Sequence, residues 1–356
     1  MKTYIIAEAG VNHNGSLEMA KQLVDVAVNA GANAVKFQTF QAKELVTENA
    51  QKAKYQLQTT DKTETQFEML KRLELTEEMH DELLAVCNQK GIEFLSTPFD
   101  NDSLQLLTRK YNLKTIKIPS GEITNAPFLL KIAQSKRKII LSTGMSTLGE
   151  VEQALEIIAF GLIESGEPPS KENFRSAYCS VKGQKALQQY VSLLHCTTEY
   201  PTPFEDVNLR AMDTLKQAFQ LPIGISDHTP GFTVPIAAVA RGATIIEKHF
   251  TLDRLLPGPD HKASLVPNEL ILMVKGIRNV EKALGNAQKY PLRSEMKNLN
   301  VARKSIVANK KINKGDVYTD ENLAIKRPGN GRSAIDYWDL IGKTATDNYE
   351  KDEVIK

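Results

Sequence analysis

Short apolar runs alternate with longer segments of helical period along most of the chain. Runs rich in β-branched residues recur before residue 255, separated by stretches in which apolar residues return every three or four positions. This alternation is typical of a parallel sheet wrapped by helices. The runs predicted as strands span residues 3–7, 34–38, 93–96, 115–119, 138–142, 192–197, 222–226 and 244–250. Eight strand and helix repeats predict an α/β fold, a (β/α)8 TIM barrel.

Local signals mark two of the helices. Residues 75–89 place Met79, Leu83 and Cys87 on one face, and Gly91 follows as a stop signal. Another helix is predicted to begin at the sequence Thr-Leu-Gly-Glu of residues 147–150, which has the form of a capping box.

Two stretches interrupt the repeat. Residues 41–66 are mostly polar and follow the second predicted strand, where a long connection is a candidate lid over the barrel mouth. Residues 165–188 contain Glu-Pro-Pro-Ser and scattered lysines, which indicates a surface insertion without a catalytic role.

The composition changes after the last predicted barrel helix, which carries Leu270, Val274, Ile277 and Leu284. We therefore expect a catalytic barrel over residues 1–285, a polar linker over 286–300 and a small domain over 301–356. Short strand-like runs and turns fill the small domain. So short a segment is expected to dock on another surface.

Charge and composition exclude several classes of function. Lys and Arg number 45 against 43 Asp and Glu, so nothing indicates a nucleic-acid partner. No run of 18 apolar residues occurs, and Met1 leads at once into a strand-like segment; we expect a cytoplasmic protein that does not bind membranes. Cys87, Cys179 and Cys196 lack the spacing of a disulfide framework or a zinc knuckle, and are read as reduced structural thiols.

Polar side chains end almost every predicted strand. In a TIM barrel the carboxyl ends of the strands converge on one mouth, where the chemistry takes place. The strand-end groups are Glu8, Asn12, His13, Lys36, Gln38, Ser96, Thr97, Lys117, Ser120, Glu122, Ser142, Thr143, His195, Thr197, Thr198, Tyr200, Ser226, Asp227, His228, Glu247, Lys248 and His249. Their repetition at equivalent positions indicates an active site.

The histidines differ in what their positions allow. His228 and His249 follow adjacent strands, where two neutral imidazoles with carboxylate and water can hold Mn²⁺, Fe²⁺ or Co²⁺, although either could be structural. His195 lies on an apolar strand and could belong to the core or to the site. His13 could contact the site or brace its turn, and His80 is read as an inert residue of a surface helix.

Lys36 and Lys117 lie on the second and fourth predicted strands. Burying an ammonium group is costly unless an anion meets it, so a phosphate or carboxylate ligand is expected. Hydroxyl groups for that anion would come from Thr97, Ser120, Ser142 and Ser226. A Schiff-base lysine, as in an aldolase, is the competing interpretation.

Ordered motifs along nearly the whole chain resemble the sialic acid (N-acetylneuraminate) synthase family, which includes legionaminic and pseudaminic acid synthases. The motifs include Ile-Ile-Ala-Glu-Ala-Gly-Val-Asn-His-Asn-Gly at 5–15, Val-Lys-Phe-Gln-Thr at 35–39, Lys-Ile-Pro-Ser-Gly-Glu at 117–122, Ser-Asp-His at 226–228, Glu-Lys-His-Phe at 247–250 and Lys-Arg-Pro-Gly-Asn-Gly at 326–331.

The resemblance implies a TIM barrel with a C-terminal antifreeze-like (SAF, β-clip) domain that is swapped within a homodimer. It implies a transferase that condenses phosphoenolpyruvate with an open-chain N-acylated mannose-type sugar, with C–O cleavage and release of phosphate. His228 and His249 would hold a divalent metal, Mn²⁺ with Co²⁺ or Mg²⁺ as alternatives. The other implied site residues are Lys36, Thr97, Lys117, Ser120, Ser142 and Ser226 for phosphoenolpyruvate, Gln38, Glu122, Tyr200, Asp260 and Arg327 for the sugar, and Glu8, Lys36, Lys117 and Glu122 for catalysis.

Some points stay open at this level. Thr198 stands where some family members have Asn near the phosphate. N-acetylmannosamine is the favoured acceptor, and a 2,4-diacetamido-trideoxy hexose, leading to legionaminic or pseudaminic acid, is the alternative. The remote alternative functions are a non-catalytic sugar-binding protein and a Schiff-base aldolase.

Overall fold

The structure is a computed structural model that describes residues 2–53, 56–61, 63–164 and 166–356. The chain divides into two compact units, Met1–Gly285 and Asn286–Lys356. Each unit has a hydrophobic core of its own.

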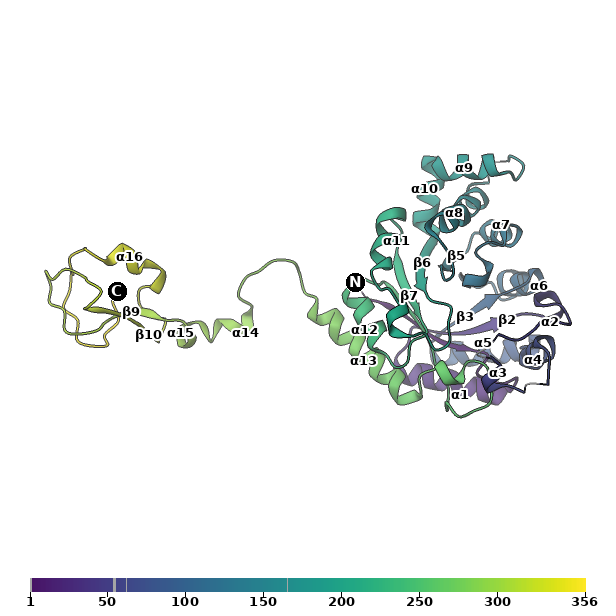
Figure 1. Cartoon of the computed structure of the whole chain (residues 1–356), viewed down its shortest axis with the longest axis horizontal. Coiled ribbons are helices and arrows are strands. Elements are labelled where there is room, and N and C mark those ends of the chain that lie inside the picture. The colour runs from purple at the N-terminus through teal and green to yellow at the C-terminus, as the bar shows by residue number, and fades with distance from the viewer. Residues whose placement is uncertain (1, 54–55, 62, 165) are drawn as a thin grey trace. The chain divides into compact units, whose positions relative to one another are not determined.

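Eight parallel strands form the sheet of the first unit (Figure 1). They are β1 Tyr4–Gly10, β2 Ala34–Thr39, β3 Glu93–Pro98, β4 Thr115–Ile118, β5 Lys138–Ser142, β6 Val191–Cys196, β7 Ile223–Asp227 and β8 Ile245–His249. Hydrogen-bonded neighbours follow the order β3-β2-β1-β8-β7-β6-β5-β4, and β3 and β4 at its two ends contact each other, so the sheet closes into a barrel. The TIM-barrel prediction is confirmed. The first strand continues to Gly10 rather than ending at residue 7, which puts Glu8 inside the strand.

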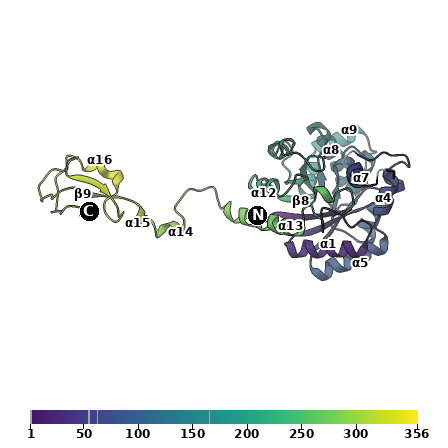
Figure 2. The same cartoon turned by 60° about the horizontal axis from the view of Figure 1, so that its bottom comes forward.

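Helices follow the strands and surround the sheet (Figures 1 and 2). They are α1 Leu17–Ala30, α2 Ala42–Leu45, α3 Gln56–Thr59, α4 Gln66–Leu73, α5 Glu77–Lys90, α6 Asn101–Gln105, α7 Ala126–Gln134, α8 Leu148–Ile163, α9 Lys171–Cys179, α10 Val181–Tyr190, α11 Ala211–Phe219, α12 Thr233–Ala240 and α13 Pro267–Ala283. The predicted capping box is present, with Thr147 and Glu150 at the start of α8. Leu284 lies beyond the end of α13 and is exposed, so it does not belong to the apolar face predicted for that helix.

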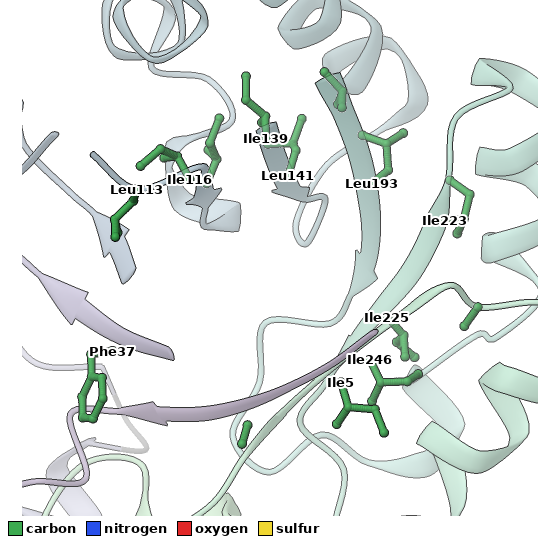
Figure 3. Packing of buried hydrophobic residues seen from close by; sticks show 14 of the residues in the cluster. Ile5, Phe37, Leu113, Ile116, Ile139, Leu141, Leu193, Ile223, Ile225 and Ile246 are labelled. Atoms are coloured by element: carbon green, nitrogen blue, oxygen red, sulfur yellow. The ribbon is translucent and has the colours of Figure 1, made fainter. Parts of the chain in front are cut away.

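The two faces of each strand build different layers. Outward-facing side chains such as Ile5, Phe37 and Ile246 pack against the helices in one large cluster, of which Figure 3 labels members on or next to successive strands. Inside the barrel, six residues close the floor: Ile6, Ala34, Leu95, Ile140, Leu194 and Ile245. Because side chains alternate along a strand, the residue two positions after each of these also faces inward, one layer nearer the carboxyl ends.

The structure adds detail to one expectation from the sequence and corrects another. Residues 165–188, predicted as a surface insertion, contribute α9 and most of α10, which pack on α8. His80, predicted to be an inert residue of a surface helix, is fully buried on the inner side of α5. Its Nε2 lies 2.8 Å from the Thr39 hydroxyl, so it joins the helix to the outer face of β2.

The second unit pairs β9, Ser305–Ala308, with the antiparallel strand β10, Leu323–Lys326. Ile306, Ile312, Leu323, Tyr349 and other apolar residues form its core. Its short helices are α14 Arg293–Met296, α15 Leu299–Ala302 and α16 Tyr337–Leu340. In the described part of the chain, no helix is both long and apolar enough to cross a bilayer.

Candidate active site

A polar layer lies directly above the apolar floor of the barrel. It consists of the inward-facing residues two positions after the floor residues, Glu8, Lys36, Thr97, Ser142, Cys196 and Glu247, together with Lys117 and Ser226. All eight residues are buried. Parallel register brings them together, since Glu8 pairs with Lys36 and Ser226 pairs with Glu247 across adjacent strands.

Two buried lysines share one carboxylate. Glu247 Oε2 lies 3.7 Å from Lys36 Nζ, and Glu247 Oε1 lies 3.6 Å from Lys117 Nζ. The Ser226 hydroxyl donates to Glu247 Oε1 over 2.7 Å and fixes its orientation. Glu247 is therefore the internal counter-ion that lets two ammonium groups stay in the interior.

Hydroxyl groups accompany each lysine. Lys36 Nζ lies 2.6 Å from Glu8 Oε2 and donates to Thr97 Oγ1 over 2.9 Å. Lys117 Nζ donates to Ser142 Oγ over 2.8 Å. Each ammonium is thus held in place by a side chain on a neighbouring strand, which preorganises two positive charges for an anionic ligand.

The same network separates the acid strengths of its two carboxyl groups. Burial raises the pKa of Glu8 to about 7, although Lys36 opposes this shift. Burial also disfavours the charged form of Glu247, but Lys117 and Lys36 outweigh it and lower the pKa of Glu247 to about 2. Glu247 is therefore a fixed anion at neutral pH, whereas Glu8 can exchange a proton there.

Two histidines with one aromatic neighbour stand at the rim of the layer. The rings of His228 and His249 have centroids 5.4 Å apart, and the Tyr200 ring lies 4.1 Å from that of His228. Asp260 Oδ2 lies 3.8 Å from His249 Nδ1, and burial raises the pKa of Asp260 to about 6. Burial lowers the pKa of His249 well below its usual value, and the nearby His228 lowers it further, so His249 is neutral.

The two imidazoles fit a metal as a pair. His228 Nδ1 lies 2.7 Å from the Thr197 carbonyl, which leaves Nε2 as its ligating nitrogen. His249 Nδ1 is buried and has no hydrogen-bond partner among the described residues. The described residues contain no group of three or more His, Cys, Asp or Glu placed to bind a metal, so substrate and water would have to complete the coordination.

A cavity of about 310 Å³ opens above the layer. Of the residues predicted from the sequence, twelve line it: Glu8, Lys36, Gln38, Thr97, Lys117, Ser120, Ser142, Tyr200, Ser226, His228, His249 and Asp260. The candidate lid also contributes to it, through Leu45, Val46, Gln56 and Gln66. Three residues within that stretch, 54, 55 and 62, lie outside the described part of the chain.

Two predicted site residues are elsewhere. Glu122 lies in a short 3-10 turn, Ser120–Glu122, where it accepts a hydrogen bond of 2.7 Å from Asn125 and does not line the cavity. Arg327 belongs to the second unit, where it is exposed and its Nε donates to the Ala302 carbonyl. Glu122 therefore does not join the cluster of the first unit.

Three of the strand-end groups named from the sequence have structural partners. His195 Nε2 lies 2.6 Å from the Val207 carbonyl, and this residue does not line the cavity. His13 Nδ1 accepts from the Gly15 amide and braces the turn after β1. Lys248 points to the outer face, where it forms a buried ion pair of 2.6 Å with Asp227.

Glu247 and Cys196 also line the cavity: Glu247 was named from the sequence as a strand-end group without a specific role, and Cys196 was read as a structural thiol. Alternation places Glu247 in the cavity, since it lies two positions before His249 on the same strand face. Cys196 is buried, and its sulfur lies 3.9 Å from His228 Nδ1. The apolar residues of the candidate lid were missed because that stretch is polar on average.

Comparison with known proteins identifies the family of the chain. Residues 23–289 match the NeuB family and residues 303–356 match the SAF domain. The chain belongs to the NeuB family. It ends in a SAF domain, as the sequence motifs implied, and it is a phosphoenolpyruvate-dependent nonulosonic acid synthase, a transferase.

Curated relatives of known name span the whole chain. An N,N'-diacetyllegionaminic acid synthase of Campylobacter jejuni is 51% identical over 100% of this chain and 99% of its own length. A protein of the same name from Legionella pneumophila is 44% identical over 98% of this chain and 92% of its own. The human N-acetylneuraminate-9-phosphate synthase is 33% identical over 99% of this chain and 91% of its own length.

A solved structure shares the architecture. The N-acetylneuraminic acid synthetase of Leptospira borgpetersenii, crystallised with citrate, superimposes with a TM-score of 0.66 at 33% identity, covering 83% of this chain and 90% of its own. The sequence motifs favoured N-acetylmannosamine as acceptor. The two legionaminic acid synthases support instead the alternative that it left open.

Proposed function

We propose that this protein is a legionaminic acid synthase that condenses phosphoenolpyruvate with a 2,4-diacetamido-2,4,6-trideoxyhexose. The observation that carries this choice of acceptor is the 51% identity to a legionaminic acid synthase over the entire chain. Relatives named for sialic or pseudaminic acid are 33–34% identical over nearly the same length.

Phosphoenolpyruvate would lie on the polar layer. Lys36 and Lys117 would bind its phosphate and carboxylate groups, assisted by the hydroxyls of Thr97, Ser120, Ser142 and Ser226, all of which line the cavity. Burial lowers the pKa of Lys117, and Glu247 opposes this shift while holding both lysine side chains in position before the ligand arrives. That role follows from its low pKa and its place between the lysines.

The reaction joins C3 of phosphoenolpyruvate to the aldehyde carbon of the open-chain sugar. The aldehyde oxygen gains a proton, water adds at C2 and loses a proton, and the C–O bond to phosphate breaks. Glu8 is the carboxyl group best suited to hold or transfer these protons, because its pKa of about 7 lets both forms exist at neutral pH. Glu122, the other candidate, does not line the cavity.

The sugar would contact Gln38, Tyr200 and Asp260 on the side of the two histidines. A divalent ion held by His228 and His249, which we propose to be Mn²⁺ with Co²⁺ or Mg²⁺ as substitutes, would polarise the aldehyde oxygen. Tyr200 packs against both imidazole rings and so helps fix their orientation.

We further propose a homodimer in which the SAF domains are exchanged and Arg327 of one subunit reaches the sugar bound in the other. Arg327 is exposed in its own unit. The same unit exposes 86% of Ile335 and 76% of Trp338, and such large apolar side chains are common at interfaces. The cytoplasmic location expected from the sequence stays a prediction.

Phosphate release tests the reaction and its acceptor together. The protein is incubated with phosphoenolpyruvate, Mn²⁺ and, separately, 2,4-diacetamido-2,4,6-trideoxymannose, N-acetylmannosamine and the 2,4-diacetamido-2,4,6-trideoxyaltrose that leads to pseudaminic acid. We expect the largest kcat/KM with the first sugar and a product whose mass equals sugar plus phosphoenolpyruvate plus water minus phosphoric acid. A larger kcat/KM with either other sugar would overturn the choice of acceptor.

A further inference from the structure

The cavity also has an apolar lining. Seven apolar residues form what we call the apolar wall: Val11, Leu45, Val46, Met69, Leu70, Leu73 and Phe99. Val11 and Phe99 follow β1 and β3, whereas the other five belong to α2, to the residue that follows it, and to α4. The long connection after β2 therefore supplies most of the wall.

Three residues of the wall form a small core with Phe40. Val11, Phe40, Met69 and Leu73 are buried in one cluster, against which Leu45, Leu70 and Phe99 pack. The rings of Phe40 and Phe99 meet edge to face with centroids 6.1 Å apart. Leu45, Val46, Leu70 and Phe99 are only half-buried, so they keep surface that a ligand can cover.

Polar contacts hold the connection in place. Lys52 is buried, and its ammonium donates to the Thr60 hydroxyl over 3.0 Å, to the Asp61 carbonyl over 2.7 Å and to Glu64 over 2.9 Å. At the start of α2, the Ala42 amide donates to Glu74 over 2.7 Å. Thr65 and Glu68 form a capping box at the start of α4. These contacts therefore hold the residues of the wall in a defined arrangement.

We propose that the apolar wall is the specificity-determining subsite for the acceptor, and that it binds the C6 methyl group and the C4 acetamido methyl group of the sugar. This inference rests on the proposed function. Both lysines lie in the polar layer, which therefore binds the anionic phosphoenolpyruvate. The apolar wall has no charged group for that ligand and is available to the sugar. The amides of Gln38 and Gln66 also line the cavity and can pair with acetamido groups.

The wall explains a preference against N-acetylmannosamine. That sugar carries hydroxyl groups at C4 and C6, which would lose water against Val46 and Leu70 without gaining a partner from them. The trideoxy sugar carries a methyl group at C6 and an acetamido group at C4. One methyl group, or one misplaced hydroxyl, changes kcat/KM in an apolar pocket by roughly 10–200-fold.

Val46→Thr and Leu70→Asn test the subsite, because each keeps the size of the side chain roughly constant while making it polar. Leu57→Asn is the matched control, since Leu57 belongs to the same connection, is 38% exposed and does not line the cavity. For each protein, kcat/KM is measured with the trideoxy sugar and with N-acetylmannosamine, and the KM for phosphoenolpyruvate is measured at saturating sugar. Thermal unfolding identifies any variant that fails to fold, in which case the milder Val46→Thr carries the test.

We expect Val46→Thr and Leu70→Asn to lower kcat/KM for the trideoxy sugar by about tenfold or more. N-acetylmannosamine should be unaffected or improved, and the KM for phosphoenolpyruvate and the control should stay unchanged. If folded variants lose kcat/KM equally with both sugars, or with neither, the subsite assignment is overturned while the proposed function stays intact. A wild-type protein that does not turn over the trideoxy sugar would instead overturn the proposed function.

Discussion

The Glu8 carboxylate lies 2.6 Å from the Lys36 ammonium group, and both side chains are almost fully buried. Burial raises the pKa of Glu8 to about 7, so this pair changes charge near neutral pH. Below that pH, Glu8 is protonated and the positive charge of Lys36 is free to attract an anion. Above it, the Glu8 carboxylate competes with that anion.

The affinity for phosphoenolpyruvate should therefore fall as the pH rises through about 7. An anion bound beside Glu8 raises the pKa of Glu8 further, so binding takes up a proton and weakens by up to about tenfold per pH unit. Titration calorimetry from pH 6 to 9 measures this affinity. The Glu8→Gln variant should lose the part of the pH dependence that comes from Glu8 and keep the part that comes from ionisation of the phosphate group of the ligand. Identical pH profiles for the two proteins would contradict the assignment.

Replacing His228 or His249 by Ala should abolish metal binding and activity with little loss of folding stability. Both residues line the cavity rather than the hydrophobic core, and their rings contact Tyr200 and each other. Metal content after dialysis, measured by mass spectrometry, is the readout. His195→Ala serves as control, because its ring contacts the Val207 carbonyl outside the cavity. Unchanged metal content in either site variant would rule out the assignment.

Lys117→Met should weaken phosphoenolpyruvate binding by about 10- to 150-fold, which corresponds to the loss of one charge-assisted hydrogen bond of about 1.5–3 kcal/mol. The variant also leaves Glu247 with one lysine fewer, which adds to the effect. Calorimetry compares it with Lys21→Met, whose side chain pairs with Glu82 far from the cavity. Equal affinities would place the anion site elsewhere.

Lys248→Met should destabilise the fold, because it leaves the buried Asp227 carboxylate without its counter-ion. The cost of breaking such a pair is about 3–5 kcal/mol, whereas replacing both partners by apolar residues is far milder. Urea unfolding of Lys248→Met, Asp227→Leu and the double variant measures the coupling. Additive losses would show that the 2.6 Å contact does not stabilise the protein.

Arg327→Ala tests the exchanged dimer when it is mixed with His228→Ala. In such a dimer each mixed pair contains one site with both lesions and one with neither, so subunit exchange should restore part of the activity. Native mass spectrometry verifies that mixed dimers form. Mixed dimers without any recovery would mean that Arg327 acts within its own chain or outside the reaction.

The periodicity of the chain was enough to predict the barrel and the polar groups at its mouth. Every predicted strand is present, and thirteen of the strand-end residues named from the sequence line one cavity, because parallel strands of a closed barrel deliver their carboxyl ends to one mouth. His80 shows the limit of that reasoning. It stands on the same helix face as Leu83 and Cys87, and the packing of α5 on β3 buries it, with its ring nitrogen beside the Thr39 hydroxyl.

The sequence by itself determined which residue types stand at each strand end, since alternation and motif order are properties of the chain. Only the tertiary structure decided how those groups share charge. Glu247 became the counter-ion of Lys36 and Lys117 because barrel closure brings its carboxylate on β8 within 4 Å of the ammonium groups on β2 and β4. The pKa values of Glu8 and Glu247 separate for the same reason. Burial and the distances to the lysines depend on contacts between different strands of the barrel, which no local pattern encodes.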